Sequence, residues 1–372
     1  MKKILFLTGT RADFGKLKSL IKKVESSQHE AYVFVTGMHM IEKYGSTVLE
    51  VEKSVESSIY KFINQNPHDT MDIVLSKTTA GLSDYVKGIK PDLIVVHGDR
   101  VEALAGALVG ALNNILVAHI EGGEVSGTID ELIRHSVSKM AHIHFVCNDD
   151  ARQRLLQLGE CEDSIFVIGS PDLDIMNSAT LPDIQLVKEH YELPFDNYSI
   201  LLFHPVTTEL DSLTQQAEAL ADAAIESGRN FVVIYPNNDH GNEMILSAFS
   251  KFENNAQFAV FPSVRFEYFL TLLKNADCMI GNSSAGVREA PFYGLPSIDI
   301  GSRQKNRSSA KSIVNVEPVK SDILDAFKKV ESMKCDATRE FGEGKSDEKF
   351  IDALNSNSLW KLPKQKMFID RG

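Results

Sequence analysis

Acidic residues follow two short apolar runs of the sequence, at positions where strands are expected to end. Asp99 comes after the run at 92–97, and Glu121 and Asp130 come after the run at 115–119. Carboxylates at the C-terminal ends of parallel strands project into the crevice where open α/β sheets bind ligands. These three side chains are therefore candidates for proton transfer with a bound substrate.

Each of these carboxylates also has a purely structural interpretation. An aspartate at a helix start is often a cap, which would account for Asp99. Thr128 and Glu131 fit a capping box, and the helix dipole favours Asp130 in the same first turn. Glu121 precedes two glycines that would let the backbone approach a ligand closely, yet a solvated turn residue has the same pattern. At this point both interpretations stay open.

A second set of residues could bind an anion. The segment 8–16, TGTRADFGK, follows the first expected strand, and a helix start of this kind can direct backbone N–H groups at an anion. It matches neither the P-loop nor the G-x-G-x-x-G fingerprint. Because the net charge is −12, an anionic ligand would need local positive charge. The arginines next to expected turns or glycines are the candidates: Arg11, Arg100, Arg288, Arg303 and Arg307.

The second half of the chain repeats this arrangement. His204 stands before a proline at the end of an expected strand and could donate to a phosphate, although a lone histidine is more often partly buried with a partner. The segment 281–289, GNSSAGVRE, offers hydroxyls and amides that suit a diphosphate, and Glu289 could bind a ribose diol. Turn chemistry alone explains 236–241, PNNDHG, and solvated surface alone explains the basic loop 301–307.

Composition excludes several classes of protein. With 43% apolar and 24% charged residues, the 372-residue chain is typical of globular domains, and its acidic balance argues against nucleic-acid binding. The four cysteines are far apart, which argues against a zinc site or disulfide framework and fits reduced thiols in the cytoplasm. No run is long or apolar enough for a signal peptide or a membrane span. His142 and His144 lack an apparent third metal ligand, and strand alternation explains them better.

Apolar runs alternate with helical patterns, which is the signature of parallel α/β sheets. A pause at 170–198 separates two similar halves, so we expect two Rossmann-like domains at 1–170 and 171–355. Packing of the segment 356–372 back onto the first domain is an option that the sequence leaves open. The expected strands are 3–8, 31–36, 92–97, 115–119, 143–147, 165–168, 199–203, 231–235, 257–261, 277–281 and 297–300.

In their order and spacing, the motifs resemble the hydrolysing UDP-N-acetylglucosamine 2-epimerases, which make N-acetylmannosamine for sialic acid synthesis. The resemblance covers most of 4–310 and rests on TGTRADFGK, HGDR, HIEGGEVSGTIDELIRH, HPVTTE, PNNDHG, GNSSAGVREAP and the R-Q-x-x-R of 303–307. It implies the GT-B fold, in which two Rossmann-like, doubly wound domains face a central cleft that holds the nucleotide sugar.

The resemblance also implies a reaction. A base removes the sugar C2 proton while UDP leaves from C1, and water then adds across the double bond of 2-acetamidoglucal with inversion at C2. The implied catalytic residues are Asp99, Glu121, Asp130 and His204. The implied substrate-binding residues are Arg11, Gly15, Lys16, Arg100, His204, Asn237, Gly281, Asn282, Ser283, Ser284, Glu289, Arg303 and Arg307. The family needs no metal or nicotinamide, and we expect a cytoplasmic homo-oligomer, a dimer or tetramer, without nucleic-acid or membrane partners.

Three alternatives remain at this level. Relatives with the same motifs act on UDP-2,4-diacetamido-2,4,6-trideoxyglucose in legionaminic acid synthesis, and nothing in the sequence identifies the substituents at C4 and C6. A GT-B glycosyltransferase would need an acceptor site. A non-catalytic nucleotide-sugar-binding protein would not need three convergent carboxylates.

Overall fold

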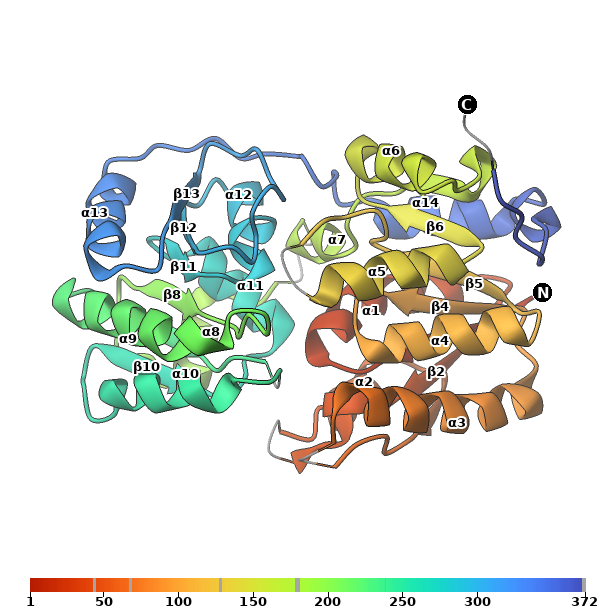
Figure 1. The fold of residues 1–372 in the computed structure, drawn as a ribbon, viewed down its shortest axis with the longest axis horizontal. Coiled ribbons are helices and arrows are strands. Elements are labelled where there is room, and N and C mark those ends of the chain that lie inside the picture. The colour runs from red at the N-terminus through yellow and green to blue at the C-terminus, as the bar shows by residue number, and fades with distance from the viewer. Residues whose placement is uncertain (43–44, 67–68, 127–128, 178–180, 238, 370–372) are drawn as a thin grey trace. The chain divides into compact units, whose positions relative to one another are not determined.

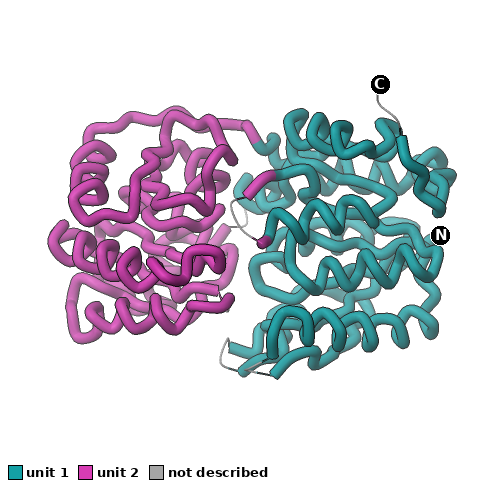
Figure 2. The backbone as a smooth tube through the Cα atoms, in the orientation of Figure 1, with its two compact units in different colours: residues 1–124, 130–178, 341–372 teal, residues 125–129, 179–340 magenta. Residues whose placement is uncertain are grey.

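The computed structural model describes residues 1–372 except 43–44, 67–68, 127–128, 178–180, 238 and 370–372. The chain forms two compact units (Figure 2). Unit 1 comprises 1–124, 130–178 and 341–372, and unit 2 comprises 125–129 and 179–340. This division differs from the expected domains 1–170 and 171–355, because 171–177 and 341–355 belong to unit 1 and 125–129 is grouped with unit 2.

Unit 1 is built on a seven-stranded parallel sheet with the order β3-β2-β1-β4-β5-β6-β7 (Figure 1). The order reverses between β1 and β4, which makes the sheet doubly wound. Its strands are β1 (Lys3–Thr8), β2 (Glu30–Val35), β3 (Ser58–Lys61), β4 (Leu93–His97), β5 (Leu116–Ile120), β6 (Ile143–Val146) and β7 (Ile165–Val167). Its helices are α1 (Arg11–Glu25), α2 (Val48–Ser54), α3 (Met71–Ile89), α4 (Val101–Leu112), α5 (Ile129–Met140), α6 (Asp149–Gln157), α7 (Asp172–Met176) and α14 (Ser346–Asn355).

The core of unit 1 includes a helix from the far end of the sequence. Phe350 of α14 is fully buried, and its ring centroid lies 6.3 Å from that of Phe6 and 4.8 Å from that of Phe145. Helices on both faces leave the central strands buried, which explains their continuous apolar runs.

Unit 2 repeats the same topology with the strand order β10-β9-β8-β11-β12-β13, which reverses between β8 and β11. The predicted fold class, two parallel doubly wound α/β domains, is thereby confirmed. Its strands are β8 (Ser199–Leu202), β9 (Phe231–Ile234), β10 (Phe258–Phe261), β11 (Met279–Gly281), β12 (Ser297–Ile300) and β13 (Ile313–Val316). Its helices are α8 (Ile184–His190), α9 (Leu210–Glu226), α10 (Asn242–Phe249), α11 (Phe266–Lys274), α12 (Glu289–Phe292) and α13 (Lys320–Glu331).

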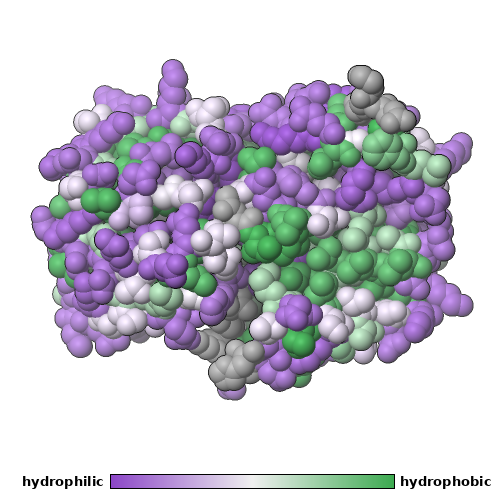
Figure 3. All heavy atoms as spheres, viewed as in Figure 1, coloured by the Kyte–Doolittle hydropathy of each residue, from purple (hydrophilic) through white to green (hydrophobic). Residues whose placement is uncertain are grey.

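The surface of unit 1 carries apolar side chains on the face formed by α3, α4 and α5 (Figure 3). Leu112 at the end of α4 is 78% exposed, and Leu132 of α5 is 64% exposed. Within the described part of the chain, no helix combines the length and apolar character needed to cross a bilayer.

Candidate active site

The switch point of unit 1 positions the candidate carboxylates. Asp99 follows β4, and Glu121 follows the neighbouring strand β5. Because parallel strands end at the same edge of a sheet, both residues stand at the edge where such folds bind ligands.

Glu121 is the centre of a buried polar cluster. Its backbone has a φ of 64°, a left-handed conformation that is uncommon outside glycine, and its residue surface is only 5% exposed. Oε1 accepts a hydrogen bond from Ser170 Oγ at 2.6 Å, and Lys16 Nζ lies 3.3 and 3.4 Å from the two oxygens. Nε2 of His97 lies 3.1 Å from Oε2. The carboxylate is thus fixed by partners from three separate segments.

Asp172 completes what we call the Glu121 cluster: Lys16, His97, Glu121, Ser170 and Asp172. Its Oδ2 lies 3.3 Å from Lys16 Nζ, so one buried ammonium bridges two carboxylates. Sequence analysis did not nominate His97, Ser170 or Asp172. His97 lies in the HGDR motif, whereas the other two lie at the start of the stretch interpreted as a connector.

Asp99 does not cap α4, contrary to the structural interpretation of the sequence. Arg100 occupies the N-cap position without a side-chain capping bond, and its Nε lies 3.5 Å from Glu102 Oε2. Asp99 instead accepts a hydrogen bond from the guanidinium of Arg134 on α5. Asp130 precedes Arg134 by four residues and therefore lies on the same face of α5. Asp99 is thereby directed toward the helix face that carries Asp130.

Of the capping box predicted at the start of α5, Thr128 and Glu131, the structure describes only Glu131. Thr128 lies outside the described residues. Glu131 Oε1 lies 3.5 Å from His135 Nε2, one turn further along α5.

The turn after β1 is occupied by its own aspartate. Thr10 and Asp13 form a capping box, and the amides of Gly9 and Thr10 donate to the Asp13 carboxylate at 3.0 and 3.1 Å. These two N–H groups are therefore occupied by the Asp13 carboxylate, whereas the sequence had suggested that they bind the anion of a ligand. Arg11 Nε lies 2.8 Å from Glu50, while Gly15 is buried within α1.

The two glycines after Glu121 serve packing within unit 1. A Cβ on Gly122 would lie 2.8 Å from the His119 ring and from Ser138 Oγ, and one on Gly123 would lie 2.3 Å from the Ala151 carbonyl oxygen. Close packing of the turn therefore explains both glycines without a ligand.

In unit 2, His204 and Asn282 lie on the two turns at the switch point. The Asn282 side chain accepts from the His204 amide at 2.6 Å and donates to the His204 carbonyl at 2.9 Å. Nδ1 of His204 accepts from the Asn237 amide at 3.0 Å, so a proton on the neutral ring resides on Nε2. Burial of the ring and the nearby Arg303 cation lower the pKa of His204 well below its usual value. A neutral imidazole that donates from Nε2 can hydrogen-bond a phosphate oxygen.

The turn after β11 carries the expected hydroxyls. Gly281, the last residue of β11, must be a glycine, because its φ is 135° and a Cβ would lie 1.9 Å from the Leu202 carbonyl oxygen. Ser283 caps the following short helical turn through the Ala285 amide, and Ser284 is next to it. Glu289 is buried at the start of α12.

The basic loop after β12 is tied to the same turn. Arg303 Nη1 and Gln304 Nε2 donate to the Asn282 carbonyl at 3.2 and 2.9 Å, and Arg307 donates to the Gln304 side chain at 2.8 Å. Asp299, which sequence analysis did not nominate, is buried at the end of β12. Burial raises its pKa to about 7, although Arg303 and Arg307 act in the opposite direction.

The described residues contain no cluster of three or more potential metal ligands. His144 is instead buried with its Nε2 3.0 Å from the Glu160 carboxylate, and His142 Nε2 donates to the Lys364 carbonyl at 2.9 Å. Asn237 orients His204 as described above, whereas its neighbour Asn238 lies outside the described residues.

Comparison with known proteins places these motifs in a family context. A family model described as UDP-N-acetylglucosamine 2-epimerase matches residues 22–355. A UDP-N-acetylglucosamine 2-epimerase of Neisseria meningitidis serogroup B is 50% identical over 375 residues, covering 100% of this chain and 99% of that protein. A hydrolysing UDP-N,N′-diacetylbacillosamine 2-epimerase of Legionella pneumophila is 31% identical over 366 residues, covering 96% and 97%. The fold is similar to that of a Methanocaldococcus jannaschii UDP-GlcNAc 2-epimerase solved with UDP-GlcNAc and UDP, with a TM-score of 0.80, 23% identity and coverage of 95% and 99%.

Proposed function

This chain belongs to the UDP-N-acetylglucosamine 2-epimerase family, and from that membership we propose that it is a hydrolysing 2-epimerase that releases N-acetylmannosamine and UDP from UDP-N-acetylglucosamine. The observation that carries the proposal is the Glu121 cluster beside Asp99, at the edge of the sheet where ligands bind. A nucleotide-sugar-binding protein without catalysis would not need buried carboxylates fixed in this way.

The proposed reaction has two steps. A carboxylate from the set Asp99, Glu121 and Asp130 takes the C2 proton, the C1–O bond breaks, and its electron pair leaves with UDP. Water then adds to the C1–C2 double bond, placing a hydroxyl on C1 and a proton on the opposite face of C2. Because the C2 proton is weakly acidic, the base must be held in place, and fixed partners such as those of Glu121 would do so.

Unit 2 would hold the leaving group. The neutral His204 ring would donate from Nε2 to the diphosphate, together with Ser283 and Ser284 at the start of a helical turn. Arg303 and Arg307 would supply positive charge, and Glu289 would accept from the ribose hydroxyls. The resemblance to the family implies that Arg11, Lys16 and Arg100 bind the substrate as well. In this structure each of them contacts a carboxylate, so each would have to exchange that carboxylate for a group of the substrate.

The choice of sugar rests on the relatives. The protein named for UDP-N-acetylglucosamine is 50% identical, whereas the one named for UDP-N,N′-diacetylbacillosamine is 31% identical. This difference favours N-acetylmannosamine, the precursor of sialic acid, as the product. The corresponding reaction on UDP-2,4-diacetamido-2,4,6-trideoxyglucose is the alternative.

Product analysis in heavy water tests the reaction. Purified protein is incubated with each UDP-sugar in D2O without acceptor or added metal, and the products are identified by NMR. We expect UDP and a free 2-epimerised amino sugar with deuterium at C2. Retention of the original hydrogen at C2 would point to plain hydrolysis, an intact epimerised UDP-sugar would identify a non-hydrolysing epimerase, and a strict need for a sugar acceptor would identify a transferase.

We also propose that the protein is a homo-oligomer, a dimer or tetramer. The apolar face over α3, α4 and α5 supports this, because exposed apolar surface of this kind often marks an interface between subunits (Figure 3). Light scattering on wild type and on Leu112→Lys is the test. A monomeric wild type, or a variant with an unchanged oligomer, would argue against this face.

A further inference from the structure

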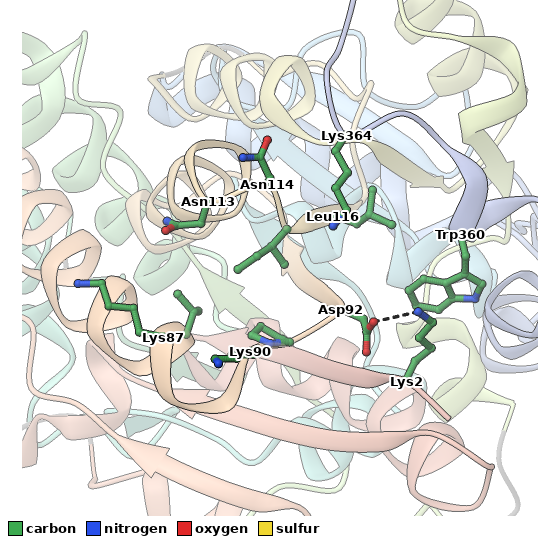
Figure 4. A pocket seen from close by; sticks show the side chains of 12 residues that line it. Lys2, Lys87, Lys90, Asp92, Asn113, Asn114, Leu116, Trp360 and Lys364 are labelled. Atoms are coloured by element: carbon green, nitrogen blue, oxygen red, sulfur yellow. Dashed lines mark hydrogen bonds and ion pairs between the residues drawn. The ribbon is translucent and has the colours of Figure 1, made fainter.

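A pocket of about 580 Å³ lies where strands of unit 1 begin, and not where they end (Figure 4). Lys2, Asp92 and Leu116 of its lining stand at the starts of β1, β4 and β5. The carboxylates of the candidate active site follow the ends of these strands, so the pocket belongs to the opposite edge of the sheet.

The lining of the pocket is positively charged although the chain as a whole is acidic. It contains four lysines, Lys2, Lys87, Lys90 and Lys364, and a single carboxylate, Asp92. Lys2 is paired with Asp92 at 2.9 Å, and Lys87 with Asp84 at 3.1 Å. Among the described residues, no carboxylate lies within ion-pair distance of Lys90 or Lys364. Two cations of the pocket therefore remain available to a ligand.

Helix dipoles account for only part of this charge. Lysines near the end of α3 stabilise the partial negative charge of that helix terminus, which explains Lys87 and contributes to Lys90. Lys364 belongs to neither helix at the pocket, since it is supplied by the segment 356–369, which we call the C-terminal strap. The strap is fixed on both sides of Lys364, because Trp360 Nε1 donates to the Leu354 carbonyl at 2.7 Å and Lys366 pairs with Glu160.

The backbone at the pocket is also unusual. Lys90 caps α3 with a φ of 50°, and Asn114, another lining residue, has a φ of 54°. Glycine is the usual residue at a left-handed helix end, and a lysine there costs conformational energy. The chain thus keeps a cation at a position where its backbone favours glycine, and backbone strain of this kind concentrates at ligand sites.

An aromatic surface stands at the other side of the pocket. Trp360 lines it beside Lys2, whose Nζ lies 5.0 Å from the ring centroid, and Val86, Pro91 and Ile115 add apolar surface. We propose that this pocket binds a small organic polyanion, whose phosphate or carboxylate groups pair with Lys90 and Lys364 and whose apolar part packs against Trp360.

Trp360 provides a direct readout because it is the only tryptophan of the chain. Tryptophan fluorescence is titrated with phenyl phosphate and with inorganic pyrophosphate at constant ionic strength. We expect a saturable change with both probes, weakened by added salt because the charges are solvent-accessible. The proposal would be overturned if neither probe gave a saturable change up to about 10 mM. A Kd above that concentration corresponds to a binding free energy of less than about 3 kcal/mol.

Matched variants assign any binding to this pocket. Lys90→Asn removes the charge and keeps a residue that tolerates the left-handed backbone, and Lys364→Gln removes the second charge. Each should weaken binding about 1.5- to 5-fold, the usual worth of an exposed ion pair. Lys361→Gln, an exposed lysine of the same strap outside the lining, is the control. Wild-type affinity in the Lys90→Asn, Lys364→Gln double variant, or equal weakening in the control, would refute the assignment.

Discussion

Glu121 is held in a left-handed backbone conformation with Lys16, His97 and Ser170 around its carboxylate. Glu121→Gln keeps the shape of the side chain but removes its ability to act as a base. Turnover should fall by roughly 10²–10⁴-fold, the usual contribution of general acid–base catalysis. Lys16 keeps Asp172 as a partner, so the folded state should survive. Steady-state kinetics and thermal melting measure the two effects separately.

Asp99→Asn and Asp130→Asn are expected to lose turnover to a similar extent while UDP affinity changes little. Glu131→Gln is the matched control on the same helix turn, because glutamine can still complete a capping box at this position and the side chain contacts His135 one turn along α5. It should remain active. An Asp130→Asn enzyme with near wild-type turnover would remove Asp130 from the site and leave a two-carboxylate mechanism.

The buried His119 should make the stability of the folded state sensitive to acid. Its Nε2 donates to the Gly98 carbonyl at 2.8 Å and its Nδ1 accepts from Ser138 at 2.9 Å, and burial lowers its pKa to about 3. Between pH 6.5 and pH 3, His119 is protonated in the unfolded chain but stays neutral in the folded chain. The contribution of His119 to the stability of the fold is therefore complete above pH 6.5 and is lost as the pH falls toward 3.

His119→Gln should therefore be destabilised at pH 8, and the difference from wild type should shrink by about 2 kcal/mol at pH 5. Urea unfolding of both proteins at the two pH values measures this difference, and the other buried histidines cancel in the comparison. A difference in stability that stays constant between pH 8 and pH 5 would show that His119 is not held neutral in the folded state.

The position of residues that directly follow a central strand could be predicted from the sequence. Asp99 and Glu121 follow clear apolar runs, so their position at the ligand-binding edge of the sheet follows from periodicity. Ser170 and Asp172 could not be predicted, because they reach Glu121 and Lys16 only through the folding of a polar stretch far along the chain. The anion-binding interpretation of the segment 8–16 also overlooked that Thr10 and Asp13 form a capping box, which occupies the amides of this turn.

At the scale of elements, Asn282 joins the turns that follow β8 and β11 through two hydrogen bonds to the His204 backbone. Asn282→Ala leaves these partly buried backbone groups without their partners, which should cost about 1–3 kcal/mol of stability. UDP affinity should fall as well, because the proposed phosphate donor loses its fixed position. Chemical denaturation and calorimetric titration with UDP provide the two values.

Asn275→Ala is the control in the same unit. It removes a side-chain hydrogen bond to the Thr271 carbonyl at 2.8 Å that does not involve His204. UDP affinity should stay unchanged in this variant. Unchanged UDP affinity in Asn282→Ala would instead show that the orientation of His204 does not matter for binding.

Element prediction succeeded for the central strands of both sheets and for the edge strands β7 and β10, but it missed the other two edge strands. β3 has the sequence SIYK with mostly exposed residues, and β13 is the other edge strand that was missed. Edge strands need not be apolar, so their sequences lack the continuous runs that identify central strands. The connector at 170–198 proved to contain α7 and α8.

At the scale of the whole molecule, the chain leaves unit 1 and returns to it. The returning segment contributes Phe350, Leu354 and Leu359, all fully buried in the core of unit 1. The large hydrophobic cluster of unit 2, in contrast, has its buried residues within 201–330, and the unit itself is one nearly continuous segment, 179–340, joined by 125–129. Local sequence patterns could not reveal this difference, because the contacts of α14 join residues more than 200 positions apart.

This connectivity predicts different behaviour for fragments of the two units. A fragment of 181–340 contains its whole core and should fold alone with a cooperative urea transition. A fragment of 1–177 should not, because it lacks the aromatic and leucine side chains of 341–369, and adding this segment as a separate peptide should restore folding. Phe350→Ala in the full chain should cost about 3–5 kcal/mol, as buried phenylalanines generally do. Circular dichroism and urea unfolding are measured for both fragments, with and without the added peptide for 1–177, and for the Phe350→Ala protein. Cooperative unfolding of 1–177 by itself would show that α14 covers a core that is already complete.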